Sequence, residues 1–115
     1  MYWILFYDVA SDVASDVETD WAERCKPFRD EHRSLAESSQ RMGFLVMAGN
    51  FDDRTGGLAL IFRCDDEAIV EQFVRDDPYV RAGLVTSWSI RRWNVEVGPD
   101  TVRGFGQSRS GIWER

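Results

Sequence analysis

The residue in this chain best suited to proton transfer is His32, the only histidine in the sequence. On a helix with 3.6 residues per turn, residues 28–42 place His32 on a mainly apolar face. That face also carries Phe28, Leu35, Ala36, Ser39 and Met42, joined by Trp21 and Cys25 if the helix begins earlier. Imidazole titrates near neutral pH, so His32 is a candidate general acid or base. The alternative is a core histidine whose ring nitrogens are satisfied by neighbouring groups.

Other reactive side chains give weaker signals. Cys25 and Cys64 lie far apart and form no Cys-x-x-Cys pair, so with one histidine we expect no metal site. Lys26 could lower the pKa of its neighbour Cys25, but a single cysteine on a helix face is more often part of the packing. Asp52 and Asp53 fit a hairpin turn better than a metal site.

Composition and charge exclude several classes of function. The 115 residues are 43% hydrophobic and 30% charged, as in a soluble single domain. A net charge of −6 disfavours binding to nucleic acid or to an anionic membrane surface. No apolar run reaches membrane-spanning length, and we expect a cytoplasmic protein. The aromatic content of 13% suggests that some rings contact a ligand or partner.

The apolar patterns predict four strands and two main helices. Strands are expected at residues 2–8, 44–49, 58–63 and 84–95. The helix at residues 28–42 should stop at Gly43, with Asp20 and Glu23 as a possible capping box ahead of it. A second helix should begin after Asp65 as N-cap and end at Asp76-Asp77-Pro78, with a connector at residues 79–83. Residues 9–18, with the duplicated VASD, read as a solvated loop.

This order, β-α-β-β-α-β, predicts an α+β ferredoxin-like fold with a four-stranded antiparallel sheet and both helices on one face. The first strand is apolar on both sides, and the pairs Leu45/Met47 and Phe44/Val46 suggest the same for the second. The uncovered face would then be a large apolar patch, so we expect a homodimer packed through it. We assign residues 1–95 to the domain and residues 96–115 to an irregular tail. The tail is either mobile or held to a neighbouring chain by Phe105, Ile112 and Trp113.

Two separated motifs resemble the YciI-like family, also called the YCII-related domain. The similarity covers residues 2–93 and is best at Arg29-x-x-His32 and at Asp77-Pro78-Tyr79 followed by Ala82-Gly83-Leu84. It implies a dimeric α/β barrel and a His–Asp pair in a cleft between the helices and the sheet. On this chain the pair maps to His32 and Asp77, with Asp76 adjoining the second position. Three features depart from the family pattern: Gly49-Asn50 where Gly-Pro is common, the VASD duplication and the long tail.

A carboxylate beside an imidazole fixes its tautomer and orientation. Without a nucleophile in the motif, the pair suits proton abstraction and return with no cofactor: isomerisation of, or elimination from, a small organic acid or phenolic compound. Arg29, one turn before His32, could orient an anionic substrate, although a plain surface arginine is the more ordinary interpretation. Tyr79 could line the pocket or only pack after Pro78. Asp77 could instead serve only as a turn residue that bonds local backbone N–H groups.

Two other functions remain open at this point. The same cleft could belong to a non-catalytic dimeric protein that binds a small metabolite, with His32 making only a hydrogen bond. Cofactor-independent oxygenases also occur among similar dimeric barrels, which is an analogy of fold alone.

Overall fold

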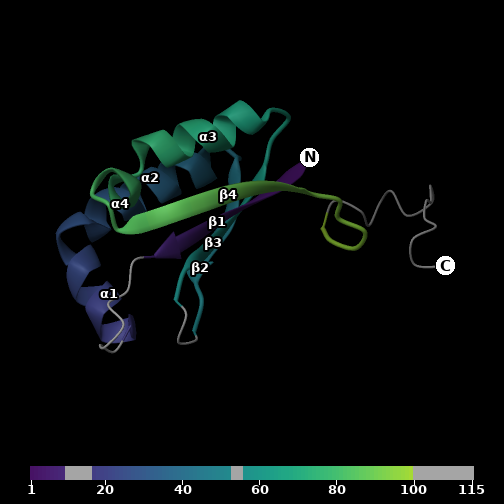
Figure 1. Cartoon of the computed structure of the whole chain (residues 1–115). Coiled ribbons are helices and arrows are strands. Elements are labelled where there is room, and N and C mark those ends of the chain that lie inside the picture. Colours follow the sequence, from purple (N-terminus) through teal and green to yellow (C-terminus); the bar gives the residue numbers. More distant parts are fainter. Residues whose placement is uncertain (10–16, 53–55, 100–115) are drawn as a thin grey trace.

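The computed structural model describes residues 1–9, 17–52 and 56–99, and it contains four strands and four α-helices within them. The elements are β1 (Tyr2–Val9), α1 (Val17–Cys25), the 3-10 helix η1 (Lys26–Phe28), α2 (Arg29–Arg41), β2 (Leu45–Asn50), β3 (Leu58–Arg63), α3 (Glu67–Asp76), α4 (Pro78–Arg81) and β4 (Val85–Trp93). The strands form one antiparallel sheet in the order β2-β3-β1-β4. The predicted α+β class, with the strand order of a ferredoxin-like fold, is therefore confirmed (Figure 1).

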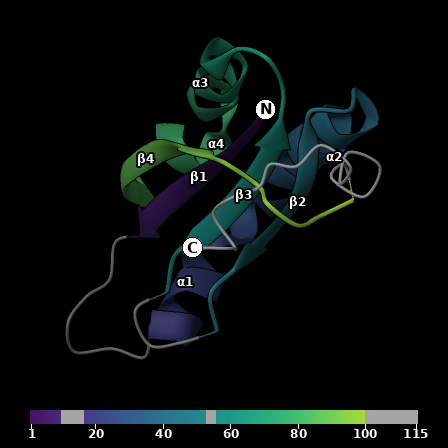
Figure 2. The same cartoon turned by 90° about the vertical axis from the view of Figure 1, so that its right-hand side faces the viewer.

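The helices cover one face of the sheet, and the core lies between them. Figures 1 and 2 show α2 and α3 on the same side of the four strands. Side chains alternate along β1, so Trp3, Leu5 and Tyr7 are buried beneath the helices, whereas Ile4 and Phe6 on the opposite face are only half-buried. The first strand is thus apolar on both faces, as expected, but within this chain helices cover only one of them.

An irregularity in β2 alters the predicted face pattern. Leu45 pairs with Phe62, but the next paired residue, Met47, lies opposite Ile61, so the register shifts between them. A bulge of this kind turns the following side chains to the other face. Leu45 is therefore buried at 6% exposure, while Met47 is 61% exposed. The prediction that Leu45 and Met47 share one face was wrong.

The segment before His32 is more helical than the sequence indicated. The helix α1 begins at Val17, so Asp20 and Glu23 do not form the start of a helix. Val17 and Glu18 are helical and Val9 is in β1, which corrects the ends of the expected loop; the rest of the VASD duplication, at residues 10–16, lies outside the described residues. Pro27 sits in η1, where its missing N–H costs little.

Several ends of elements also differ from the predictions. After α2 the chain turns at Gly43, whose φ of +88° favours glycine, as predicted for this stop. On that face of α2, Met42 was expected among the apolar residues but is 63% exposed. The N-cap of α3 is Asp66, one residue later than Asp65, because the Asp66 carboxylate accepts from Ala68 N at 3.0 Å. Residues 78–81 form the short helix α4 instead of an irregular connector.

The last strand ends at Trp93, two residues before the predicted end. The domain assignment of residues 1–95 stays a prediction, and the tail residues Phe105, Ile112 and Trp113 lie outside the described residues. Among the helices in the described ranges, none has the length and apolar character needed to cross a membrane. Within the same ranges, no three His, Cys, Asp or Glu side chains gather in a way that could hold a metal ion.

Candidate functional site

A completely buried carboxylate stands at the start of α4. Asp77 is 0% exposed and accepts hydrogen bonds from three parts of the chain. Its Oδ1 accepts from the backbone N–H of Tyr79 at 3.0 Å and lies 2.9 Å from Nδ1 of His32 on α2. Its Oδ2 accepts from the hydroxyl of Tyr7 on β1 at 2.8 Å. A buried carboxylate needs this number of donors, because an unpaired buried charge is costly.

The contact with Asp77 determines the tautomer and the orientation of the His32 ring. A carboxylate only accepts, so Nδ1 of His32 carries the hydrogen and donates it to Asp77. In the neutral imidazole the other nitrogen, Nε2, then holds a lone pair. Nε2 has no hydrogen-bond partner among the described residues, and the His32 side chain keeps 13% of its surface exposed. The ring is therefore anchored at one end and open at the other.

Tyr79 supports His32 from the side. Their rings stack, with centroids 3.9 Å apart and planes 9° from parallel. The Tyr79 ring also meets Trp21 of α1 edge to face at 5.4 Å. These contacts restrict the imidazole to one plane, which is the arrangement a proton-transfer group requires.

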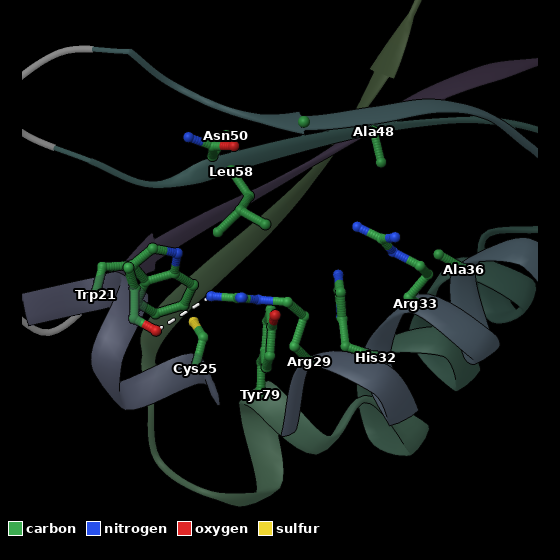
Figure 3. A pocket seen from close by; sticks show the side chains of 12 residues that line it. Trp21, Cys25, Arg29, His32, Arg33, Ala36, Ala48, Asn50, Leu58 and Tyr79 are labelled. Atoms are coloured by element: carbon green, nitrogen blue, oxygen red, sulfur yellow. Dashed lines mark hydrogen bonds between the residues drawn. The ribbon is translucent and has the colours of Figure 1, made fainter. Parts of the chain in front are cut away.

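The open end of His32 faces a pocket of about 420 Å³ between the helices and the sheet. Figure 3 shows one wall from α1, α2 and α4, with strands β2 and β3 opposite. The lining residues are Trp21, Ala22, Cys25, Arg29, His32, Arg33, Ala36, Ala48, Gly49, Asn50, Leu58 and Tyr79. Gly49 and Asn50, which stand where the family commonly has Gly-Pro, both belong to it. The pocket is large enough for a compound of one or two rings.

The hairpin between β2 and β3 closes tightly against β1. Gly57 has a φ of +99°, and a Cβ atom at this position would lie 2.9 Å from the backbone oxygen of Tyr7. Both the backbone angle and the close approach require glycine. The hairpin thus packs directly against the backbone of the strand that supplies the Tyr7 hydroxyl to Asp77.

Burial keeps the phenol and thiol groups of the site in their neutral forms. Desolvation, reinforced by the charge of Asp77, raises the pKa of Tyr7 far above its usual value. Desolvation also raises the pKa of Tyr79 to about 12 and that of Cys25 to about 11. The suggestion that Lys26 lowers the pKa of Cys25 is therefore wrong: the loss of hydration outweighs nearby positive charge.

The sequence profile of the YCII-related domain matches residues 1–94 of the chain. This chain belongs to the YCII-related domain family. Among solved structures, it resembles 5-chloro-2-hydroxyhydroquinone dehydrochlorinase (TftG) from Burkholderia phenoliruptrix AC1100, determined in complex with 2,5-dihydroxybenzoquinone. The TM-score is 0.62 at 18% sequence identity, and the match covers 82% of this chain and 94% of the other. None of the curated proteins matches the chain.

The fold of this YCII-domain protein brings together the site residues that the sequence singled out. His32 and Asp77 are in contact although 45 positions separate them, and Tyr79 both packs after Pro78 and lines the pocket. Asp77 also accepts a hydrogen bond from the backbone N–H of Tyr79, which is the local turn contact expected if it were only a turn residue. Arg29 lies at the pocket, and one of its nitrogens, Nη2, donates to Ala22 O at 3.2 Å.

Two polar residues at the site were not identified from the sequence. Tyr7 stood in an apolar run that indicated only a strand, and nothing local distinguishes its hydroxyl from the neighbouring aromatic groups. Arg33 lies off the apolar face of the helix on which His32 was predicted, yet it lines the pocket next to His32. The sequence did place Trp21 and Cys25 on the same face as His32 if the helix begins earlier, and both residues line the pocket.

Proposed function

We propose that this protein is a cofactor-free enzyme in which His32 is the general acid and base and Asp77 its orienting partner. The reaction is isomerisation of, or elimination from, a small organic acid or phenolic compound. The observation that carries the proposal is the 2.9 Å contact between Nδ1 of His32 and the fully buried Asp77, which leaves Nε2 at the pocket. A bonded tautomer with one free nitrogen is the arrangement that a general base needs.

The chemistry begins when Nε2 takes a proton from a carbon or hydroxyl of the substrate. Asp77 stabilises the imidazolium that results, because its negative charge is 2.9 Å from Nδ1. In an isomerisation, Nε2 returns the proton to a different atom of the substrate. In an elimination, the electron pair of the broken bond forms a new double bond, and the leaving group departs with its own electron pair. Proton transfer of this kind contributes about 10²- to 10⁴-fold to a rate.

The dehydrochlorinase that shares this fold makes elimination the first reaction to test. The name of that protein describes loss of hydrogen chloride from a chlorinated hydroxyhydroquinone, and its bound ligand is a dihydroxylated quinone. At 18% identity this similarity shows the fold alone, so the substrate of the present protein is a separate question. That ligand is a single six-membered ring and agrees in size with the pocket of about 420 Å³.

The test begins with a thermal-shift screen of small carboxylates and phenols, including 5-chloro-2-hydroxyhydroquinone, because a ligand stabilises the folded state by mass action. Compounds that bind are then assayed for exchange of carbon-bound hydrogen in D₂O and for release of chloride. We expect His32→Gln to lose about 10²- to 10⁴-fold in rate. Asp77→Asn should also slow the reaction, because an amide no longer fixes the tautomer of His32.

Binding without turnover would contradict the proposed enzymatic function. If compounds bind with Kd values that depend on His32, yet wild type and His32→Gln show the same absence of turnover, the protein is a binding module for a small metabolite. Arg41→Gln is a matched control, because Arg41 is an exposed residue of the same helix that does not line the pocket.

We further infer that a second copy of the chain covers the open face of the sheet and forms a dimeric α/β barrel. This face carries Ile4, Phe6 and Ile61, which are half-buried, and Met47 and Trp93, which are 61% and 44% exposed. An apolar surface of this kind is uncommon on a monomer. Two copies related by a two-fold axis would bury the same residues on both sheets.

Analytical ultracentrifugation tests the dimer. We expect the wild-type protein to sediment as a dimer and Ile61→Glu, which places a charge on the open face, to sediment as a monomer. Met42→Glu is the control, because Met42 is an exposed apolar residue, at 63% against 61% for Met47 of the open face, but lies at the end of α2 on the helical side. A wild-type protein that is monomeric at about 100 μM would contradict the inference, because this concentration is well above the dissociation constants of stable dimers.

A further inference from the structure

The charged residues that line the pocket are basic, although the protein as a whole is acidic. The protein contains 20 acidic and 14 basic residues. Among the described residues that line the pocket, however, there are two arginines, Arg29 and Arg33, and no carboxylate. Asp77 lies behind His32 and is itself fully buried, so its charge is already matched by its own donors. A strongly acidic protein thus forms a cationic pocket at its candidate site, which favours an anionic ligand.

The two arginines are not equivalent. Arg29 is held by its bond to Ala22 O at 3.2 Å, and Figure 3 shows its guanidinium directed toward α1. Arg33 has no hydrogen-bond or ion-pair partner in the part of the chain that the structure describes. In Figure 3 the Arg33 guanidinium points to the same part of the pocket as the free nitrogen of His32. Arg33 therefore has all its donors available in the part of the pocket where a reacting group would lie.

The opposite wall limits the shape of the ligand. Above His32 and Arg33 the strands contribute Ala48, and further along Leu58 and the amide of Asn50, so the part of this wall that faces Arg33 is small and apolar (Figure 3). A ligand between the two walls therefore has a compact carbon skeleton toward the sheet and its polar groups toward α2. Nε2 accepts a hydrogen bond, and a guanidinium donates two in parallel to a carboxylate or to vicinal oxygens.

We propose that Arg33 selects the substrate by charge: the pocket takes a small organic anion whose ionised oxygens pair with the Arg33 guanidinium while an adjacent acidic hydrogen faces Nε2 of His32. The second half of this statement rests on the proposed function, and the first half does not. Ionised hydroxy acids and hydroxylated phenolates have both features. Neutral phenols, amides and esters lack the charge that pairs with Arg33 and are poor ligands.

Benzoate and benzamide are the probes, because they share a ring and a planar head group and differ in charge. Binding is followed by calorimetry and by the NMR signals of the imidazole, which need no assignment because His32 is the only histidine. We expect benzoate to bind at least 10-fold more tightly than benzamide. Arg33→Gln should weaken benzoate binding by about 10- to 100-fold, the usual value of a charged hydrogen-bonded contact.

Arg41→Gln is the matched control and should leave benzoate binding unchanged. Arg33→Lys keeps the charge but loses the paired donors, so it should fall between wild type and Arg33→Gln. Equal binding of benzoate and benzamide, an unaffected Arg33→Gln, or no binding of benzoate at about 20 mM would each overturn the proposal. Arg33-dependent binding of benzoate without turnover of any compound would end the proposed enzyme and leave this inference intact.

Discussion

Two helices of this protein begin at an aspartate, and the two positions have the same local chemistry. Asp66 caps α3 and Asp77 caps α4, both with extended backbone angles. In each case the carboxylate accepts from the backbone N–H two residues later at 3.0 Å. The surroundings differ completely: Asp66 is exposed, whereas Asp77 is 0% exposed. Local sequence decides the cap, but it does not decide what else the carboxylate does.

The difference comes from distant parts of the chain. At Asp77, β1 supplies the hydroxyl of Tyr7 and α2 supplies Nδ1 of His32, from positions 70 and 45 residues away in the sequence. At Asp66 the described contacts are local: its carboxylate bonds Ala68 and its carbonyl oxygen accepts from the Cys64 thiol at 3.5 Å. The comparison shows how an ordinary capping residue becomes a candidate catalytic partner once folding buries it among remote donors.

The largest expected effect is on the stability of the start of α4 at high pH. Three neutral acids surround it, and burial raises the pKa of Tyr7, of Tyr79 to about 12 and of Cys25 to about 11. In the unfolded chain the thiol ionises near its ordinary pKa of 9.0 and the phenols near 10.0. Above pH 9 the unfolded state therefore releases protons that the folded state retains, and the stability present below pH 9 is lost as the pH approaches 12.

Urea unfolding at a series of pH values, followed by circular dichroism, measures this loss. Tyrosinate absorbance at 295 nm should rise together with unfolding. Tyr7→Phe removes one of the three acids and should make the decrease shallower. A free energy of unfolding that stays constant from pH 8 to pH 11 would contradict the buried, neutral state of these groups.

The next effect separates the two aspartates directly. Asp77→Ala removes the cap and leaves the Tyr7 hydroxyl and Nδ1 of His32 without an acceptor in a buried site. We expect a loss of about 3–5 kcal/mol in the free energy of unfolding, as for breaking a buried pair. Asp66→Ala removes only a surface cap and should cost about 1 kcal/mol. Similar losses for both variants, measured by urea denaturation, would mean that the buried contacts of Asp77 contribute nothing.

The contribution of Tyr7 alone is smaller. Tyr7→Phe keeps the ring and leaves Oδ2 of Asp77 unpaired, which should cost about 1–3 kcal/mol. The NMR spectrum of the single imidazole should also show a smaller share of the Nδ1-protonated tautomer, since Asp77 is held less firmly. Ser87→Ala is the control: it removes an exposed hydroxyl bond to the Asp8 carboxylate at 2.7 Å and should be nearly neutral. An unchanged tautomer would limit Tyr7 to a structural role.

Sequence reasoning was successful where the determining interactions are local. The order of strands and helices follows from apolar periodicity, and Asp77-Pro78 ends α3 because a residue before proline avoids helical angles. The helical wheel placed His32 on the inward side, where it now faces the pocket. The pairing with Asp77 came from the resemblance, because an aspartate before proline is by itself typical of a turn residue.

Features that depend on distant partners could not be predicted in this way. The bulge in β2 is set by pairing with β3, so the alternating pattern of residues 44–47 assigned Met47 to the wrong face. The bond of Tyr7 to Asp77 joins residues 70 positions apart. Arg33 lies next to His32 in sequence but not on the apolar face of the helix. Its side of the helix lines the pocket only because β2 lies opposite it.

The smallest effect concerns a surface ion pair close to Asp77. Among the described contacts, no such pair lies beside Asp66. Arg81 of α4 donates to Glu31 of α2 at 2.9 Å and to the Asp76 carbonyl at 2.8 Å, with both charged side chains more than half exposed. Arg81→Gln should therefore change the free energy of unfolding by less than about 1 kcal/mol. A double-mutant cycle with Glu31→Gln measures the coupling between the two side chains, and high salt should reduce it.

Lys26→Gln is the matched control, because Lys26 pairs at 3.8 Å with Glu23, which is only three residues away in the sequence. Glu31 immediately precedes His32, so the Arg81 contact ties the imidazole's helix to the segment that carries Asp77. A coupling that is small in stability but large in turnover would show that this surface pair maintains the geometry between the two catalytic candidates. A coupling above about 2 kcal/mol in stability would instead place Arg81 with the buried contacts of Asp77, and the start of α4 would then depend on the surface as well as on the core.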